Sequence, residues 1–343
     1  MRYRFLTALI GLISINLAAQ AFEIETQTNF PAASTSASIR ILSTADIDLF
    51  APIIQGFQAA NPRIEVIYTT VSSTEVLQAI VVEDEAFDLV VSSAMDLQTK
   101  LANDGFAVRV SNSGTALVPE WAKWRESVFA FTQEPAAIVI SPAAFDGLDL
   151  PTTRQDLITT LRAYPERFKG RVGTYDVRSS GLGYLFATQD SRTSEAYWRL
   201  SEVFGQLETR LYCCSSAMIE DVSRGEIAVA YNVLGSYANT RTDLGETISV
   251  IEPNDFTTVM LRSAFVPRNA PNPDAAQSFL DHLLTRAWAP QPGIPFPYPN
   301  AQTDLNDSAK LKPIRLGPGL LVFLDRFKRE QFIAAWENAV LQK

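Results

Sequence analysis

Apolar and polar residues follow one another in blocks that predict three strand–turn–helix units early in the chain. Short apolar runs predict buried strands, and longer stretches with an apolar residue every three or four positions predict helices. The expected strands lie at 39–42, 64–68 and 87–91, and the expected helices at 47–60, at 75–82 and before Gly105. A turn and a helix follow each strand, which is typical of a parallel α/β sheet with right-handed crossovers.

This alternation breaks in the apolar stretch at 128–140, where we expect the chain to cross into a second lobe. The elements expected beyond it are helices at 157–164, 194–207 and 218–224 and strands at 172–175 and 226–232. A tight turn from Asp176 to Gly181 follows the first of these strands and leads into an amphipathic helix. The second strand is expected to carry Tyr231 and Asn232 at its end.

The remaining pattern predicts a return to the first lobe. The elements expected there are strands at 247–252 and 257–266 and a helix at 272–284, and one or two closing helices are expected within 320–341. A chain that passes from lobe one to lobe two and back predicts a hinged α/β clamshell, in which binding is coupled to closure. Each lobe is expected to be a mostly parallel sheet flanked by helices. The predicted parts are a flexible leader at 22–38, lobe one at 39–130, lobe two at 131–255, and a return with C-terminal helices at 256–343.

The N-terminus has the pattern of a secretory signal peptide. Arg2 and Arg4 precede an apolar stretch at 5–18, and Ala19-Gln20-Ala21 is a small-x-small cleavage site. We expect cleavage after Ala21 and export to the periplasm. No later stretch of the sequence is long and apolar enough to predict a membrane span.

Length and charge narrow the classes of partner. The chain of 343 residues is longer than one hydrophobic core usually serves, which favours two domains. A net charge of -9 argues against nucleic-acid binding. It leaves an anionic ligand open, because local donors rather than total charge govern a small site.

The only two cysteines, Cys213 and Cys214, are neighbours. Export favours a disulfide. However, neighbouring Cα atoms lie about 3.8 Å apart, which is below the usual range for a disulfide. A vicinal disulfide and two free thiols both remain open, and no metal-ligand spacing surrounds the pair.

Hydroxyl side chains recur in the turns that follow the predicted strands. In open α/β sheets, ligands bind in the crevice outside the carboxyl ends of the strands. Taken singly, each Ser or Thr is more easily explained as a helix cap. Their repetition in four turns favours a polar cleft, lined by Ser43, Thr44, Ser72, Ser92, Ser93, Arg178, Ser179, Ser180 and Gly181.

Motifs for enzymatic chemistry are missing from the sequence. The single histidine, His282, lies in a predicted amphipathic helix, where a structural role is expected. Neither a Gly-x-Ser-x-Gly elbow nor a His-Glu-x-x-His motif occurs. We therefore expect no enzyme and no cofactor, although a pair of carboxylates set by spatial distance stays open.

Several stretches resemble bacterial extracellular solute-binding proteins of ABC importers, nearest to the group that binds iron(III), thiamine or aminoethylphosphonate. The resemblance is carried by Ile39–Ile80, by Asp88–Gln98, by Gly225–Tyr237 and by the helix Asn272–Leu284. It implies a type II periplasmic-binding-protein fold, an ABC permease as partner and a solute held between the lobes. By position it points to Ser43, Thr44, Ser92, Ser93, Arg178, Ser179, Ser180, Gly181, Ser216 and Tyr231.

The resemblance has one gap. Ferric-binding members present two adjacent tyrosines, whereas Asn232 follows Tyr231 in this sequence. We therefore expect a metal-free site, and iron(III) binding is the weaker alternative.

The leading hypothesis is the periplasmic capture of a small polar, anionic solute such as a phosphonate, phosphate ester or carboxylate. Arg178 would pair with the anion and Tyr231 would hydrogen-bond or stack on the solute. The alternatives are a surface salt bridge for Arg178 and a core position for Tyr231. The closed clamshell could also signal to a sensor histidine kinase, and we expect a monomer in either role.

Overall fold

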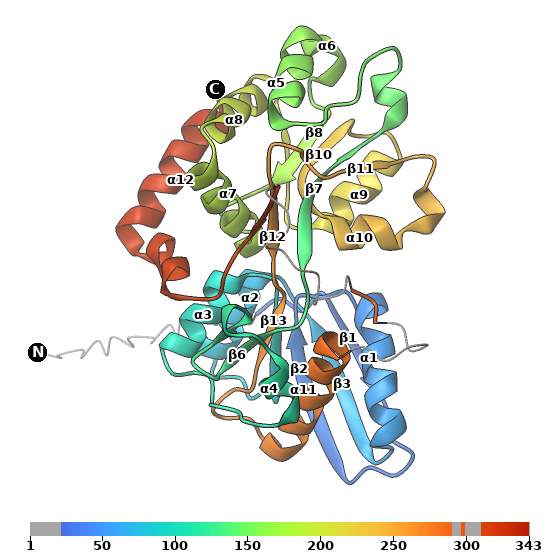
Figure 1. The fold of residues 1–343 in the computed structure, drawn as a ribbon, viewed down its shortest axis with the longest axis vertical. Helices are drawn as coiled ribbons and strands as arrows, with labels where there is room; N and C mark the ends of the chain where they lie inside the picture. Colours follow the sequence, from blue (N-terminus) through green and yellow to red (C-terminus); the bar gives the residue numbers. More distant parts are fainter. Residues whose placement is uncertain (1–21, 290–295, 299–309, 343) are drawn as a thin grey trace, which may run out of the picture.

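The protein consists of two α/β lobes, each built on a seven-stranded sheet with helices packed around it (Figure 1). The computed structural model describes residues 22–289, 296–298 and 310–342. The expected two-lobed clamshell is confirmed. The proposed signal peptide lies outside the described residues. Among those described, no helix has the length and apolar character needed to cross a membrane.

The first sheet has the strand order β1-β3-β2-β4-β13-β6-β5. Strand β2 runs parallel to β3 and β4, whereas β1, β13 and β5 pair antiparallel to their neighbours, so the sheet is mixed rather than mostly parallel. The strands are β1 Thr26–Phe30, β2 Ala37–Ser43, β3 Ile64–Thr70, β4 Leu89–Ser92, β5 Lys123–Trp124, β6 Val128–Ala130 and β13 Ser263–Phe265.

Helices cover this sheet because each buries one apolar face against it. In α1 the residues Leu49, Phe50, Ile53, Ile54 and Phe57 are buried, at the spacing expected for one face of a helix. The helices of the first lobe are α1 Ile47–Ala60, α2 Ser73–Leu77 with a π-helical turn Gln78–Val82, α3 Met95–Asn103, α4 Ser113–Leu117 and α11 Pro273–Trp288.

The second sheet has the order β14-β12-β7-β10-β8-β9, with β11 also paired to β7. It is mixed as well, because β7 runs antiparallel to β10, β11 and β12 while β8, β9 and β10 are parallel. The strands are β7 Glu134–Ile140, β8 Val172–Tyr175, β9 Arg210–Tyr212, β10 Val229–Leu234, β11 Ser249–Ile251, β12 Thr257–Met260 and β14 Leu311–Pro313.

Seven helices of the described chain pack in the second lobe. They are α5 Arg154–Ala163, α6 Pro165–Phe168, α7 Gly181–Thr193, α8 Ala196–Gln206, α9 Ser215–Ser223, α10 Gly235–Thr240 and α12 Arg326–Val340. Helix α12 follows a 3₁₀ segment, Pro318–Leu324, and lies along α8 (Figure 1). Its Phe332 and Trp336 share an apolar cluster with Tyr184 and Tyr197 of the second lobe.

The chain crosses between the lobes where the sequence breaks its alternation, again near Arg262, and a third time between α11 of the first lobe and β14 of the second sheet. The expected return to lobe one therefore ends with α11, because β14 and α12 belong to the second lobe. The stretch at 128–140 divides into β6 in the first sheet and β7 in the second. The strand expected at 257–266 divides in the same way into β12 and β13, so the return to the first sheet follows Met260 rather than Asp255. The strand expected at 247–252 is β11, which pairs with β7 and so belongs to the second sheet.

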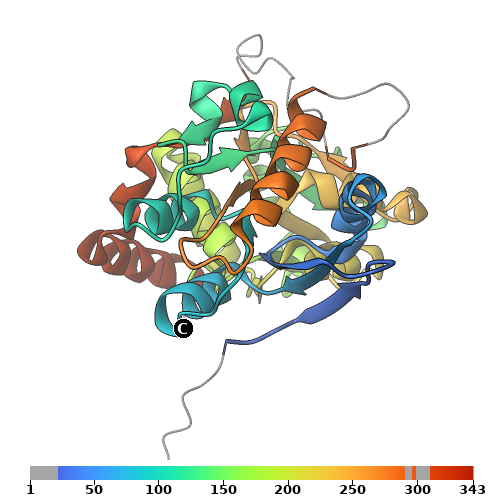
Figure 2. The same ribbon diagram turned by 90° about the horizontal axis from the view of Figure 1, so that it is seen from below.

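Two further expectations are wrong. The leader at 22–38 contains β1, an edge strand that pairs antiparallel with β3 (Figure 2). Its sequence, Thr-Gln-Thr-Asn-Phe, is polar because it lies at an edge, and it therefore lacks the apolar signal of a buried strand. Strand β10 extends to Leu234, so Tyr231 lies within the strand rather than at its end.

Candidate functional site

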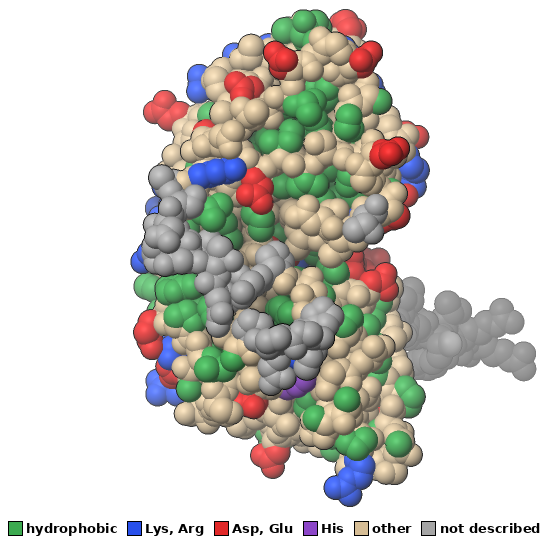
Figure 3. Space-filling model, turned by 45° about the vertical axis from the view of Figure 1, so that its right-hand side comes forward, with side chains coloured by type: hydrophobic (Ala, Val, Ile, Leu, Met, Phe, Trp, Pro, Cys, Tyr) green, Lys and Arg blue, Asp and Glu red, His purple; other side chains and the backbone are tan. Residues whose placement is uncertain are grey.

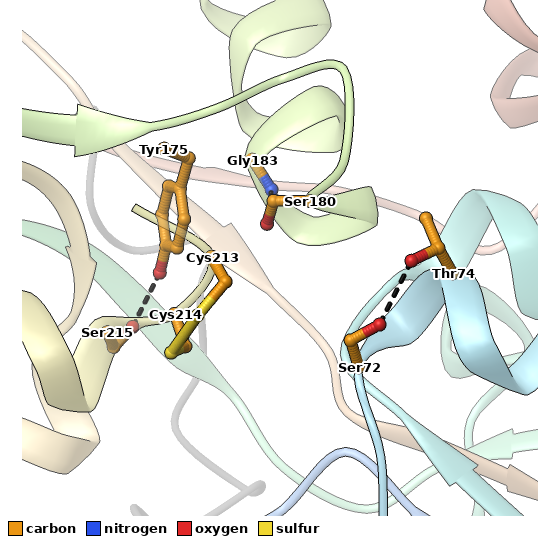
Figure 4. Close-up of a disulfide and its surroundings, with 8 residues drawn as sticks. All are labelled: Ser72, Thr74, Tyr175, Ser180, Gly183, Cys213, Cys214 and Ser215. Carbon is orange, nitrogen blue, oxygen red and sulfur yellow. Dashed lines mark hydrogen bonds between the residues drawn. A yellow bond between two sulfur atoms is a disulfide. The ribbon is translucent and has the colours of Figure 1, made fainter. Parts of the chain in front are cut away.

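A cavity of about 80 Å³ lies where the carboxyl ends of the two sheets face each other. In Figure 4, Ser72 of the first lobe lies across this space from Ser180 and the Cys213–Cys214 pair of the second. Space for one water molecule takes roughly 10–15 Å³, so the cavity suits a small solute. Its walls are formed by Glu25, Thr44, Asp46, Val71, Ser72, Ser73, Ser93, Tyr175, Ser179, Ser180, Leu182, Cys213, Cys214, Ser215, Ser216, Leu234 and Tyr237.

Two of the serine hydroxyls in this wall cap the N-termini of helices. Ser72 is the N-cap of α2 and accepts a hydrogen bond from the Glu75 backbone N–H at 3.3 Å. Ser180 is the N-cap of α7 and accepts from the Gly183 backbone N–H at 3.1 Å. Ser72 and Ser180 therefore both cap a helix and line the cavity, because the capping hydrogen bond holds each hydroxyl at the edge of the cavity.

Hydrogen bonds cross from one lobe to the other around the cavity. The Gly181 backbone N–H donates to Ser73 Oγ at 2.9 Å, and Thr74 Oγ1 donates to the Ser179 carbonyl at 3.2 Å. The Asp46 backbone N–H donates to the Tyr237 hydroxyl at 3.3 Å. These bonds join turns that belong to different sheets, so the structure is the closed form of the clamshell.

Buried Arg262 links the hinge to the cavity wall. It lies between β12 and β13, where the chain crosses, and its Nε is 3.0 Å from Oε1 of Glu134 at the start of β7. Its Nη1 donates to the Thr44 carbonyl and to Thr44 Oγ1, both at 3.4 Å. The crossing segments before β7 and between β12 and β13 are therefore tied to one residue of the first-lobe wall.

The N-terminal ends of two helices lie on the second-lobe side of the cavity. The first turns of α7 and α9 both reach the cavity, through Ser180 and Leu182 and through Ser215 and Ser216. The N-cap of α9, Cys214, makes no side-chain capping bond. In α7 the Gly181 and Gly183 N–H groups already donate to Ser73 and Ser180, so it is the dipoles of the two helices that favour an anionic group there.

The first-lobe side carries carboxylates instead. Asp46 is half-buried in the wall, and burial, together with repulsion from Asp48, raises its pKa against the opposing effect of Arg262. Burial and the charge of Asp46 also raise the pKa of Glu25, which lies at the exposed rim. The notch between the lobes has acidic side chains beside it in the space-filling view (Figure 3). Among the residues that the structure describes, no Lys or Arg lines the cavity.

A wider space of 380 Å³ adjoins this cavity and shares Asp46, Ser216 and Tyr237 with it. Asp48 and Arg241 also line this outer space. The shared residues indicate that the cavity continues toward its surroundings between α1 of one lobe and α9 and α10 of the other.

The family of the chain follows from comparison with known proteins. A family model described as bacterial extracellular solute-binding protein matches residues 39–289, well over half of the chain. The chain belongs to this family. No curated protein is similar enough to count as a match.

Solved structures agree with this assignment. The substrate-binding protein of an ABC transporter from Agrobacterium tumefaciens is 34% identical, with a TM-score of 0.85 over 92% of this chain and 98% of its own. AfuA from Actinobacillus pleuropneumoniae, with exogenous fructose-6-phosphate bound, is 16% identical, with a TM-score of 0.69 over 90% and 100%. Iron-bound HitA from Pseudomonas aeruginosa is 18% identical, with a TM-score of 0.64 over 88% and 99%. The last two share the fold alone.

In this solute-binding protein, six of the residues expected to bind lie in the cavity wall. They are Thr44, Ser72, Ser93, Ser179, Ser180 and Ser216. Ser43 and Ser92 are buried just behind the wall, where Ser43 Oγ accepts hydrogen bonds from Tyr68 and from the Ala45 backbone. Gly181 contributes by its close approach to the first lobe rather than by lining the cavity.

Arg178 and Tyr231 lie elsewhere in the protein. Arg178 donates from Nε and Nη2 to both carboxylate oxygens of Asp176, at 2.8 and 2.6 Å, and contacts Glu337 at 3.6 Å. It borders a separate space beside α3 and α7. The Tyr231 hydroxyl is buried between Arg154 and Asp190 at 2.6 and 2.8 Å. Arg178 therefore forms a salt bridge and Tyr231 occupies a core position, which are the structural alternatives that the sequence had left open.

Sequence reasoning missed several wall residues. Glu25 precedes the unrecognised strand β1, and Asp46 was taken only as part of a turn. Ser73, Tyr175 and Tyr237 also line the cavity, and the Tyr175 hydroxyl lies 2.5 Å from Ser215 Oγ (Figure 4). A search for acidic residues beside the hydroxyl-rich turns would have found Asp46, because it directly follows Thr44 and Ala45.

Cys213 and Cys214 form a disulfide between neighbouring residues, with Cα atoms 3.8 Å apart. Of the two states that the sequence left open, the structure has the bridge. Within 22–289, 296–298 and 310–342, no group of three or more His, Cys, Asp or Glu side chains is placed to hold a metal ion.

Proposed function

We propose that the protein captures a small dipolar solute between its lobes and delivers it to an ABC permease. The observation that carries this proposal is the closed, hydroxyl-lined cavity, which has helix N-termini on one side and carboxylates on the other. Delivery to a permease is supported by the similarity to the substrate-binding protein of an ABC transporter. Export with cleavage after Ala21 and a monomeric state stay predictions.

The anionic end of the solute would lie against the first turns of α7 and α9. Serine hydroxyls and backbone N–H groups bind the oxygens of carboxylates, phosphonates and phosphate esters without a cationic side chain. This keeps the anionic solute expected from the sequence but replaces Arg178 with backbone dipoles as its partner.

The cationic end would lie near Asp46 and Glu25. A raised pKa means that the surroundings disfavour the negative charge, and a protonated amine would relieve this by pairing with the ionised carboxylates. The affinity for an amine-bearing solute should therefore fall as the pH is lowered through the raised pKa values of these two groups, because a protonated carboxyl no longer attracts a cation.

Matched solutes test this proposal. Titration calorimetry should show at least tenfold tighter binding of 2-aminoethylphosphonate than of ethylphosphonate, and of β-alanine than of propionate. Asp46→Asn should remove this preference, because it deletes a charge from the wall. Asp149→Asn, an exposed position outside the cavity, is the matched control and should keep it. Equal affinity for both members of each pair would contradict the dipolar solute.

Arg178→Ala should change the affinity for 2-aminoethylphosphonate less than twofold. The guanidinium is held by Asp176 and Glu337 and does not line the cavity. A loss of tenfold or more in the same calorimetric titration would return Arg178 to the solute site.

A further inference from the structure

The disulfide Cys213–Cys214 is itself part of the wall of the solute cavity. It lies in the turn between β9 and α9, with Cys213 exposed and Cys214 half-buried. A small thiol can therefore reach at least one sulfur atom. Figure 4 shows the pair beside Tyr175 and Ser215, facing Ser72 of the other lobe.

The residues directly after the disulfide shape the second-lobe side of the cavity. Cys214 is the N-cap of α9, in an extended conformation with φ -148° and ψ 156°. Ser215 Oγ accepts from the Leu234 backbone N–H at 3.1 Å and lies 2.5 Å from the Tyr175 hydroxyl. Ser216, next along the chain, also lines the cavity. The start of α9 and its hydroxyl contacts are thus joined covalently to the disulfide.

We propose that Cys213–Cys214 is a thiol–disulfide exchange site whose redox state sets the affinity for the solute. This inference rests on the proposed function. The reductant is a dithiol, whose thiolate attacks one sulfur, breaks the S–S bond and forms a mixed disulfide. Its second thiol then resolves that bond, so two electrons and two protons pass to the cysteines and the dithiol becomes a cyclic or protein disulfide.

Reduction changes the wall for a geometric reason. The S–S bond between neighbours closes a small ring that includes the peptide linking them, and this ring restricts both side chains and the backbone before α9. Breaking the S–S bond restores rotamer freedom to both cysteines. It also leaves two thiol groups, in place of one disulfide, in the wall of a cavity of about 80 Å³. The oxidised form is the tight-binding form.

Linkage gives a second, reciprocal consequence. If oxidation strengthens binding tenfold, saturating solute must make the disulfide tenfold harder to reduce at equilibrium. For this two-electron couple, tenfold corresponds to about 30 mV. Solute in the closed cavity also covers the sulfur atoms, so it should slow their reaction with a dithiol.

The test compares full-length mature protein before and after treatment with dithiothreitol, with the thiols counted by titration. Affinity for 2-aminoethylphosphonate and β-alanine should fall at least fivefold on reduction and recover on reoxidation. The double variant Cys213→Ser/Cys214→Ser should bind like the reduced protein and ignore the reductant. An affinity that changes less than twofold, or an equal response of the double variant, would overturn the proposal.

A second measurement is independent of the solute. Amide hydrogen exchange at Ser215–Met218 should become faster on reduction of the wild type and stay constant in the double variant. If neither solute binds the oxidised protein, the proposal of a dipolar solute fails. The exchange measurement still tests whether the redox state of the disulfide controls the start of α9. Unchanged exchange, or two free thiols in the protein purified without reductant and treated with oxidant, would refute the redox inference.

Discussion

Gly181→Val is expected to weaken solute binding at least a hundredfold while both lobes stay folded. A Cβ atom at this position would lie 2.7 Å from Ser73 Oγ and 2.9 Å from Leu97 Cδ1, and both atoms belong to the other lobe. The clash therefore exists only when the clamshell is closed. Because a solute held by both lobes binds the closed form, its apparent affinity falls with the population of that form.

Calorimetry with 2-aminoethylphosphonate measures this loss, and small-angle scattering follows closure without any solute. The variant should have a larger radius of gyration than the wild type. Adding Ser73→Gly should restore part of the affinity by making room for the new side chain. Gly319→Ala, where no atom lies within 4 Å, is the control and should behave as the wild type. Closure and affinity that survive Gly181→Val would contradict the closed cavity as the binding form.

Arg154→Met is expected to lower the free energy of unfolding by about 3–5 kcal/mol, because it removes the cation that is paired with the buried carboxylate of Asp190. Arg154 is fully buried, and it donates to the Tyr231 hydroxyl and to the Phe256 carbonyl, both at 2.6 Å. Its Nη2 lies 3.5 Å from the buried carboxylate of Asp190. The network joins α5, α7, β10 and β12 of the second lobe.

Urea unfolding at constant pH measures this loss. Arg154→Met/Asp190→Asn should recover part of the stability, since it also removes the buried negative charge of Asp190. Tyr231→Phe keeps both charged groups but removes the hydroxyl that bonds to each of them, and should cost about 1.5–3 kcal/mol, the usual value for a hydrogen bond to a charged group. Neither single variant should change solute affinity more than twofold while the protein is folded, because the network does not line the cavity. A loss below about 1 kcal/mol for Arg154→Met would show that the hydrogen bonds from Tyr231, Asn232 and Thr258 are enough to stabilise the buried Asp190 carboxylate.

Elements with a strong local pattern were predicted closely. Helix α1 spans Ile47–Ala60 and strand β8 spans Val172–Tyr175, as their apolar spacing indicates. In both, the buried face depends on residues close together in the sequence, so the pattern alone contains the information. The hydroxyl-rich stretches lie at the strand ends as expected, although Ser43 and Ser92 are the last residues of β2 and β4 rather than turn residues.

Elements that depend on a distant partner were missed. The polar edge strand β1 exists because β3 offers it backbone hydrogen bonds, and no apolar pattern marks it. With β1 unrecognised, Glu25 could not be placed at the cavity. The division of 257–266 between two sheets was missed for a similar reason. An apolar stretch has the same residue pattern whether it forms one strand or two strands of different sheets.

The sequence by itself determined the two-lobed α/β plan, the hydroxyls at the strand ends and the adjacent cysteines. Only the tertiary structure decided which of these groups face the cavity. Arg178 turns to Asp176, Tyr231 is buried between Arg154 and Asp190, and Asp46 contributes a charge that faces the solute space. The physical reason is that a polar side chain follows the partner that satisfies it, and folding brings those partners from far along the chain.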